Sequence, residues 1–399
     1  MSRRVVITGS GALSASGIGT KKLKQALREG RSGIVPLEDE KFSSLRMKYA
    51  GLLGDYVAED HFTKQEISRL YDPVTQYALL AASEAVEQAG LDGLNTENTA
   101  TIIGATVGGL ETVHELSQPG ARVHPMTIPM VMGSAPGCQV AMKYGFKGPS
   151  FGVASACATT AHAIIQSALM IRSGFADSAI AGGTERICHP YLMKSWDAMR
   201  VVSPTKCAPF SATRNGMQLA DGAAVFVLEE LEAAKARGAT ILGEILGFGM
   251  CSDAGDLVAP DVNGMTKAMT NCLHDAGLSP EDIDYINAHG TGTKLNDKLE
   301  TSAIHQTFGD YSKSVLVSST KPIHGHALSA TAGLELVACL MALNEGIIAP
   351  TINYEEADPE CDLNLVTHEA RETIVKVAMN NSFAFGGLNT SFAIAAYEG

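Results

Sequence analysis

The chain has 399 residues, of which 45% are hydrophobic and 18% charged, as in folded globular proteins and unlike disordered ones. Its net charge of −13 repels phosphate backbones and argues against general nucleic-acid binding. No apolar run reaches the roughly 18 residues of a membrane span, and the N-terminus lacks a signal-peptide core. The eight cysteines are too sparse for a disulfide scaffold, and they include no C-x-x-C zinc or redox motif. We therefore expect a cytoplasmic enzyme or binding protein.

The first half of the chain alternates strands with helices, which is typical of α/β layers. Gly9-Ser10-Gly11 resembles a nucleotide loop, but Ser14 stands at its third glycine position, so we interpret it as a tight turn. The helix predicted at 158–173 is apolar almost all round and therefore buried. The other predicted strands are 5–8, 101–103, 151–154, 177–181 and 225–228, and the other helices are 21–30 and 72–90.

The same alternation of strands and helices begins again after a polar helix end at 235–238. We therefore divide the chain into an N-terminal half, 1–235, and a C-terminal half, 236–399. A small-residue turn leads into an apolar helix at 332–343, as one does before the helix at 158–173, and this predicts an internal duplication. The other elements predicted here are strands 241–249, 285–288 and 315–318 and a helix at 264–276.

Cys157 is the first candidate for chemistry. It lies where a predicted buried strand turns into the N-terminus of a buried helix. Unpaired N–H groups and a partial positive charge at such a terminus favour a thiolate, so Cys157 would be biased towards ionisation. The alternative is a small core residue, as cysteine often is. Position alone leaves these two interpretations open.

Two turns that contain histidine add to this candidate. His289 follows a predicted strand and precedes glycines, and His324 and His326 flank Gly325 just after Lys321. Histidines in loops often satisfy backbone carbonyls, but two such turns together with a cysteine favour a nucleophile and its histidines. A metal site is the competing interpretation, and it lacks a carboxylate or thiolate at ligand spacing.

Two further motifs each allow a functional and a structural interpretation. Residues 148–152 match the G-x-S-x-G pattern of serine hydrolases, but Ser150 opens a strand and does not hold the turn, so the match is accidental. Near the C-terminus, 381–389 pairs two aromatic residues with a Gly-Gly turn. It is either a buried strand and turn or a source of backbone N–H groups for an oxyanion.

With these residues in view, the chain resembles the β-ketoacyl-acyl carrier protein synthases of the thiolase superfamily, almost end to end. The family implies a thiolase-like five-layer α/β/α/β/α fold made of two duplicated halves, and a dimer. The stretches 252–254 and 348–353 look most like elongating synthases. The motifs occur in family order at 155–159, 288–291, 319–321, 325–326 and 381–383.

The resemblance implies a role for each matching residue. Cys157 would accept the acyl group, and a malonyl unit would then lose CO2 and attack the acyl-Cys157 thioester. His289 and His326 would stabilise the enolate, and Lys321, paired with Glu300, would orient them.

The same resemblance assigns further features. The backbone N–H groups of Cys157 and Phe385 would form the oxyanion hole, with Phe385 as an aromatic gate. No cofactor or metal is implied, because phosphopantetheine arrives on the carrier protein. The partners implied are a carrier bearing acyl and malonyl groups and a second synthase chain, identical or a related chain-length factor. Lys64 and Arg69 lie in a region that resembles the carrier-docking helix, and an ordinary solvated face is the alternative.

Several positions depart from the family pattern. Ala384 and Leu388 stand where Gly and Thr are usual beside the gate, and Lys294 and Asn296 replace a common Pro and Gly. These changes predict a specialised pathway, such as a polyene or other type II polyketide. A degradative thiolase would need a second cysteine in 380–389, which has none. A non-catalytic chain-length partner typically lacks the nucleophile that Cys157 provides.

Overall fold

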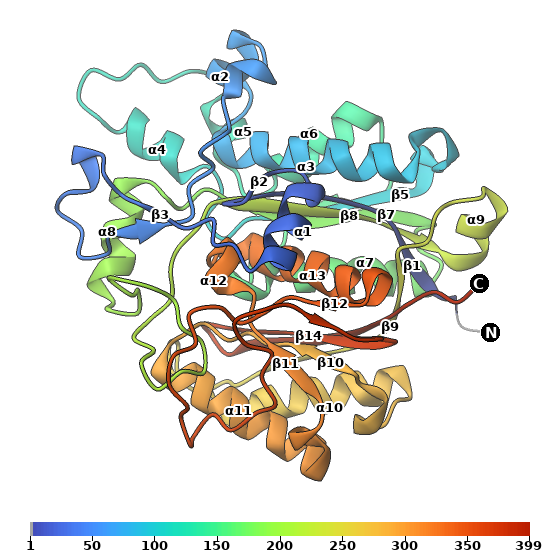
Figure 1. The fold of residues 1–399 in the computed structure, drawn as a ribbon. Coiled ribbons are helices and arrows are strands. Elements are labelled where there is room, and N and C mark those ends of the chain that lie inside the picture. The colour runs from blue at the N-terminus through green and yellow to red at the C-terminus, as the bar shows by residue number, and fades with distance from the viewer. Residues whose placement is uncertain (1–2) are drawn as a thin grey trace.

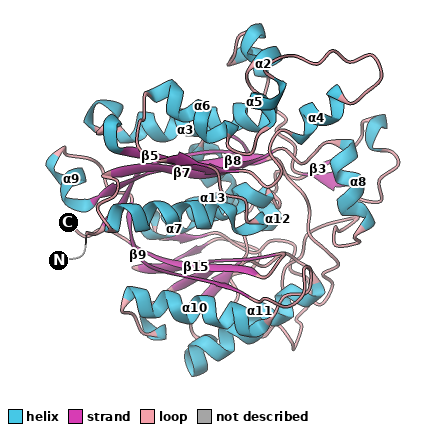
Figure 2. Ribbon diagram, turned by 180° about the vertical axis from the view of Figure 1, so that it is seen from behind, coloured by secondary structure: helices cyan, strands magenta, loops and turns pink. Residues whose placement is uncertain are grey.

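The computed structural model describes residues 3–399 and confirms a five-layer α/β/α/β/α architecture (Figure 1; Figure 2). Two sheets alternate with three layers of helices. The first sheet contains β1 (Val5–Ser14), β5 (Thr99–Gly104), β6 (Ser150–Phe151), β7 (Ser178–Glu185) and β8 (Gly222–Glu230). The second contains β9 (Gly243–Ser252), β10 (Tyr285–Asn287), β11 (Leu316–Ser318), β14 (Val377–Ala384) and β15 (Leu388–Ala395).

The two sheets repeat one strand order. The first runs β1-β8-β7-β5-β6 and the second β9-β15-β14-β10-β11. In each sheet the strands stand in the order first, fifth, fourth, second, third along the chain, so the topology shows the duplication that the sequence predicts. The proposed boundary between 235 and 236 falls in the last turn of α9 (Leu231–Ala236) and stays a prediction.

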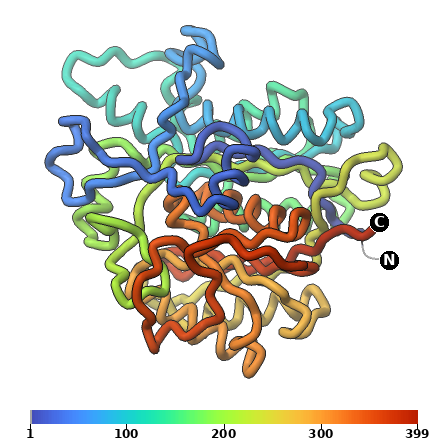
Figure 3. The backbone as a smooth tube through the Cα atoms, in the orientation of Figure 1, coloured from blue at the N-terminus to red at the C-terminus, as the bar shows by residue number. Residues whose placement is uncertain are grey.

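A short antiparallel ladder joins the two sheets. Val5, Val6 and Ile7 of β1 pair with residues of β9, so the hydrogen bonding continues from one sheet into the other. The first residues of β1 and the last residues of β15 lie on the same side of the molecule (Figure 3). Three minor strand pairings complete the pattern: β2 (Gly17–Ile18) with β1, β3 (Val35–Pro36) with β4 (Tyr49–Ala50), and β12 (Ile347–Ile348) with β13 (Arg371–Glu372).

The central layer contains α7 (Thr159–Arg172) and α13 (Thr331–Glu345). Both are apolar almost all round because sheets cover them on two sides. The segment Leu328–Glu345 is long and apolar enough to cross a membrane, but 89% of it is buried inside the structure. This segment is therefore a helix of the protein core.

The outer layers cover the other face of each sheet. On the first sheet lie α3 (Pro73–Ala89) and α6 (Ala135–Tyr144), and on the second α10 (Val262–Ala276) and α11 (Lys294–Phe308). The remaining helices are α1 (Thr20–Glu29), α2 (Lys64–Arg69), α4 (Leu110–Leu116), α5 (Thr127–Val131), α8 (Pro190–Ala198) and α12 (Lys321–His324).

Two sequence predictions need correction. Gly9 and Gly11 lie within β1, not in a turn, and their lack of a side chain lets α3 approach. A Cβ on Gly11 would lie 1.9 Å from the carbonyl oxygen of Ala81. The strand predicted at 151–154 ends at Phe151, because the chain then leaves the ladder to cross Gly104, where a Cβ would lie 2.1 Å from the carbonyl oxygen of Val153.

We predict that Gly11→Ala forces α3 away from β1 and lowers the free energy of unfolding by about 1–3 kcal/mol, the usual range for overpacking. Chemical denaturation measures this loss. Gly54→Ala is the matched control, because no atom lies within 4 Å of an added Cβ there, and its effect should stay within about 0.5 kcal/mol. Equal stability of the two variants would contradict the close packing of α3.

Candidate active site

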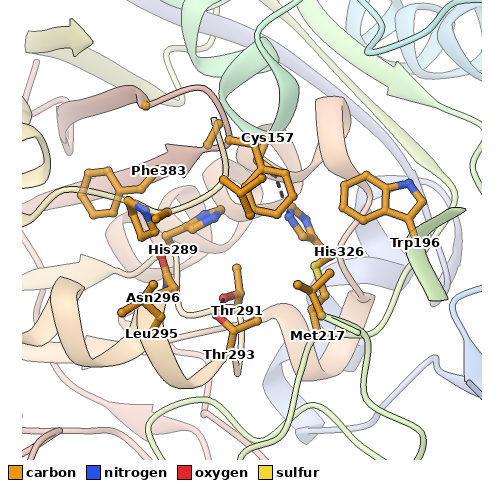
Figure 4. A pocket seen from close by; sticks show the side chains of 17 residues that line it. Cys157, Trp196, Met217, His289, Thr291, Thr293, Leu295, Asn296, His326 and Phe383 are labelled. Atoms are coloured by element: carbon orange, nitrogen blue, oxygen red, sulfur yellow. Dashed lines mark hydrogen bonds between the residues drawn. The ribbon is translucent and has the colours of Figure 1, made fainter. Parts of the chain in front are cut away.

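Both halves of the chain contribute to one cavity of about 150 Å³, lined by residues that follow the carboxyl ends of β6, β10 and β14 (Figure 4). Cys157 comes from the turn between β6 and α7. His289 follows β10, His326 follows α12, and Phe385 follows β14. The N-terminal half thus supplies the sulfur, and the C-terminal half supplies the two imidazoles and the aromatic ring.

Cys157 and His326 are in direct contact. The Sγ of Cys157 lies 3.0 Å from Nε2 of His326, drawn as a dashed line in Figure 4. The other ring nitrogen, Nδ1, lies 2.9 Å from the hydroxyl of Thr331. The His326 backbone is fixed as well, since its N–H donates to the carbonyl of Gln218 at 2.7 Å. The imidazole is therefore held with one nitrogen directed at the sulfur.

The turn that presents Cys157 has unusual backbone geometry. Ala156 has φ +48°, a left-handed conformation that costs a residue with a side chain about 1–2 kcal/mol. The duplicated turn before α13 repeats it, with Leu328 at φ +39°. Ser329 thus occupies the place of Cys157 in the second half, and its hydroxyl donates to the carbonyl of Thr184 at 2.6 Å. Only the first copy directs its side chain into the cavity.

The expectation that Cys157 is biased towards ionisation is wrong. Burial raises the pKa of the Cys157 thiol to about 12, and the nearby Lys321 ammonium only partly offsets this effect. Burial also lowers the pKa of His326 well below its usual range. The position before α7 cannot replace the lost hydration of a thiolate. The resting pair is therefore a neutral thiol beside a neutral imidazole.

His289 lies against the same pair, with its ring centroid 5.7 Å from that of His326. The ammonium of Lys321 lies 3.4 Å from Nδ1 of His289 and also donates to the His289 carbonyl. An ammonium group has no acceptor, so Nδ1 accepts and the proton of neutral His289 sits on Nε2. Burial, followed by the charge of Lys321, keeps the pKa of His289 well below its usual range.

The predicted pairing of Lys321 with Glu300 is wrong. Lys321, 1% exposed, forms its ion pair with Glu335 of α13, which is fully buried. Glu300 instead accepts the backbone N–H groups of His289 and Gly290, each at 2.7 Å. Burial raises the pKa of both carboxyl groups to about 7. Glu300 therefore shapes the loop that carries His289, and Glu335 holds the lysine.

His324 and Ser150 lie outside the cavity. The ring nitrogens of His324 contact the Thr320 hydroxyl at 2.9 Å and the Gly325 carbonyl at 2.7 Å, within its own turn. Burial lowers the pKa of His324 to about 3. Ser150 is exposed on the edge strand β6. The structure therefore gives neither residue the contacts of a nucleophile or its base.

The metal interpretation does find a geometric counterpart. Ligand atoms of Cys157, His289 and His326 lie within 4.8 Å of one another. However, the Lys321 ammonium occupies the far nitrogen of His289 at 3.4 Å and repels a cation there. The thiol must also lose its proton before it can bind a metal, which burial opposes. The residues present thus fit a neutral nucleophile and base better than an ion.

Phe385 lines the cavity and is half-buried. Its ring stacks on Trp196 of α8, with centroids 5.9 Å apart and planes 17° apart. Lys64 and Arg69 lie at the two ends of α2, exposed, and α2 lies at the top of the molecule in Figure 1. The lining of the cavity includes no residue of α2.

The sequence did not predict three residues of the site: Glu335, Trp196 and Thr331. Glu335 carried a signal, because it is a lone acid in the apolar run 332–343. Trp196 is the only tryptophan of the chain, which marked it as unusual without placing it. Thr331, which fixes His326, had no signal beyond its position at the start of a helix.

Comparisons with known proteins decide the family. Residues 2–234 match the N-terminal domain and residues 242–355 the C-terminal domain described as beta-ketoacyl synthase. The chain belongs to the beta-ketoacyl synthase family. It is an acyltransferase, and its reaction is the condensation characteristic of that family. The serine-hydrolase and non-catalytic alternatives are not favoured.

Individual relatives cover the chain throughout. Nodulation protein E of Rhizobium meliloti (strain 1021) is 44% identical over 98% of this chain and 99% of its own. 3-oxoacyl-[acyl-carrier-protein] synthase 2 of Staphylococcus aureus (strain COL) is 39% identical over 99% of both chains. Among solved structures, the ishigamide ketosynthase/chain length factor superposes with a TM-score of 0.91, at 33% identity and full coverage of both chains.

We predict that Lys321→Met destabilises the fold by about 1–3 kcal/mol, because it leaves the Glu335 carboxyl group, whose pKa burial already raises to about 7, buried without a partner. The double variant Lys321→Met/Glu335→Met should recover most of this loss in chemical denaturation. Lys321→Met/Glu300→Gln is the matched control and should recover none. If Lys321→Met/Glu300→Gln recovered the stability and Lys321→Met/Glu335→Met did not, the pairing of Lys321 with Glu335 would be contradicted.

Proposed function

We propose that the chain is a β-ketoacyl-acyl carrier protein synthase in which Cys157 carries the growing acyl chain. The observation that supports this most directly is the 3.0 Å contact between Cys157 Sγ and His326 Nε2 in a cavity that also holds His289. A thiol that a base can deprotonate is both a good nucleophile and a good leaving group, as an acyl carrier must be.

The first half-reaction transfers the acyl group. His326 Nε2 accepts the proton of the Cys157 thiol as the sulfur attacks the thioester carbonyl, and the carrier sulfur leaves as a thiol with that proton. The N–H groups of Cys157 and Phe385, both residues of the cavity wall, would stabilise the oxyanion. Because both resting groups are neutral, charge separates only during the transfer.

The second half-reaction joins the chains. A malonyl carrier thioester loses CO2, and its enolate carbon attacks the acyl-Cys157 thioester. The new carbon–carbon bond gives a β-ketoacyl carrier, and Cys157 leaves as a thiolate that takes a proton from solvent water to restore the resting thiol. His289 donates through Nε2 to the enolate oxygen, since Lys321 occupies its Nδ1. His326 can donate as well, because the Thr331 hydroxyl can serve either tautomer at Nδ1.

We propose an acyl carrier protein and a second synthase chain as partners. The name of the Staphylococcus aureus relative includes an acyl carrier protein, and that of the solved structure includes a chain length factor. A carrier would deliver both substrates on its own phosphopantetheine, so the reaction needs no further cofactor. Cytoplasmic location and a specialised polyketide or polyene pathway belong to the same proposal, the latter supported by Ala384 and Leu388 beside Phe385.

Intact mass after exposure to an acyl carrier tests the assignment. We expect an acyl adduct on wild type that is absent in Cys157→Ala and retained in Ser150→Ala. His326→Ala should slow adduct formation by about 10²-fold or more. His289→Ala should form the adduct but lose condensation by about 10²–10³-fold, the cost of one oxyanion donor. An adduct that survives in Cys157→Ala would contradict the proposal.

A separate measurement tests the docking residues. Acyl carrier proteins are acidic, and this chain carries a net charge of −13, so a local basic patch must offset long-range repulsion. Charge reversal by Lys64→Glu with Arg69→Glu should raise the carrier KM about tenfold and leave kcat unchanged. Lys267→Glu, an exposed lysine on α10, is the matched control. An unchanged KM would remove α2 from the docking surface.

A further inference from the structure

The wall of the active-site cavity is mostly apolar. Its polar residues Thr291, Thr293 and Asn296 come from the C-terminal half, which also contributes the apolar residues Leu295 and Phe383. The apolar side of the cavity includes Trp196, Val201, Met217, Ala384 and Phe385. An acyl thioester on Cys157 has a polar carrier arm and an apolar chain, so the chain belongs on the apolar side.

The apolar side continues beyond the cavity wall. Cys157, Met217 and Ala384 belong to one hydrophobic cluster, and Trp196 packs against it. Met217 is flexible and adapts to different shapes, whereas Trp196 is a large rigid plate. Trp196 therefore imposes the fixed geometry on this side of the cavity.

Trp196 and Phe385 each contribute an aromatic ring to the cavity wall. The two rings are stacked, with planes 17° apart and centroids 5.9 Å apart. Helix α8 is anchored on both sides of Trp196, which keeps its ring in place. The Asp197 carboxylate accepts the backbone N–H groups of Arg46 at 2.8 Å and Met47 at 3.2 Å, and Tyr191 stacks on His114 with centroids 4.4 Å apart.

We propose that Trp196 is a specificity-determining residue that selects planar, conjugated acyl chains over saturated ones. A conjugated chain is flat and already rigid, so it can lie face to face on the Trp196 plate and loses little conformational entropy on binding. A saturated chain loses conformational entropy at each rotatable bond when it binds, and it has no π system to lie against the Trp196 ring. This inference rests on the proposed function, since it requires an acyl group on Cys157.

The test compares two acyl donors of equal length, the octatrienoyl and octanoyl thioesters of N-acetylcysteamine, which need no carrier docking. The rate of adduct formation on Cys157 is measured for each by intact mass. The ratio of the two rates in a variant is divided by that in wild type, so that the intrinsic reactivity of each thioester cancels. Trp196→Leu should lower the ratio about two- to tenfold, the range of one aromatic contact.

Two further variants complete the design. Trp196→Phe keeps an aromatic face and should lower the ratio less than Trp196→Leu. Phe175→Leu removes an exposed aromatic ring outside the cavity, and should leave the ratio unchanged. Circular dichroism and chemical denaturation that match wild type show that Trp196→Leu is folded.

An unchanged ratio in Trp196→Leu, or an equal fall in Phe175→Leu, would overturn the proposal. If Trp196→Leu reacts with neither donor, Trp196→Met provides the same comparison with an unbranched apolar side chain. A lowered ratio there supports the proposal, and an unchanged ratio overturns it. Wild type that forms no adduct with either donor would instead overturn the proposed function, and this inference with it.

Discussion

The exclusion of water around Cys157 is the constraint on which the rest of the site depends. A buried thiolate or imidazolium would lack hydration, so the 3.0 Å contact between Cys157 and His326 joins two neutral groups in the resting enzyme. Negative charge can then develop during the reaction only at positions that hydrogen-bond donors of the site already face. Lys321 near the pair forms an ion pair with Glu335 and acts on the reaction through Nδ1 of His289.

The duplication explains how such a site is assembled. Each half builds the same sheet and the same strained turn before a buried helix, with Ala156 in one copy and Leu328 in the other. The first copy presents Cys157 to the cavity. The second presents His326 just before its turn, while its Ser329 is tied to the backbone. Two copies of one scaffold thus carry complementary groups, and the β1–β9 ladder fixes their relative position.

The sequence predicts much of this account because local patterns carry it. Apolar periodicity predicts the buried helices, and the order of the motifs predicts that Cys157, His289, His326 and Lys321 belong to one site. The sequence does not predict which residues pair over long distances along the chain. Glu300 and Glu335 both lie on helices near Lys321, and only the packing of α13 against the turn decides between them. Desolvation is likewise a property of the folded interior, so the helix position of Cys157 alone pointed to the wrong protonation state.

The pH dependence of Cys157 alkylation tests the neutral thiol–imidazole pair most directly. Intact mass after iodoacetamide, with Cys157→Ala to correct for the other cysteines, gives the rate. Burial raises the pKa of the thiol to about 12, so the thiolate fraction and the rate should rise about tenfold per pH unit between about pH 6 and 9 without levelling. A plateau with a midpoint near pH 6 to 7 would reveal a thiolate–imidazolium pair and contradict the account.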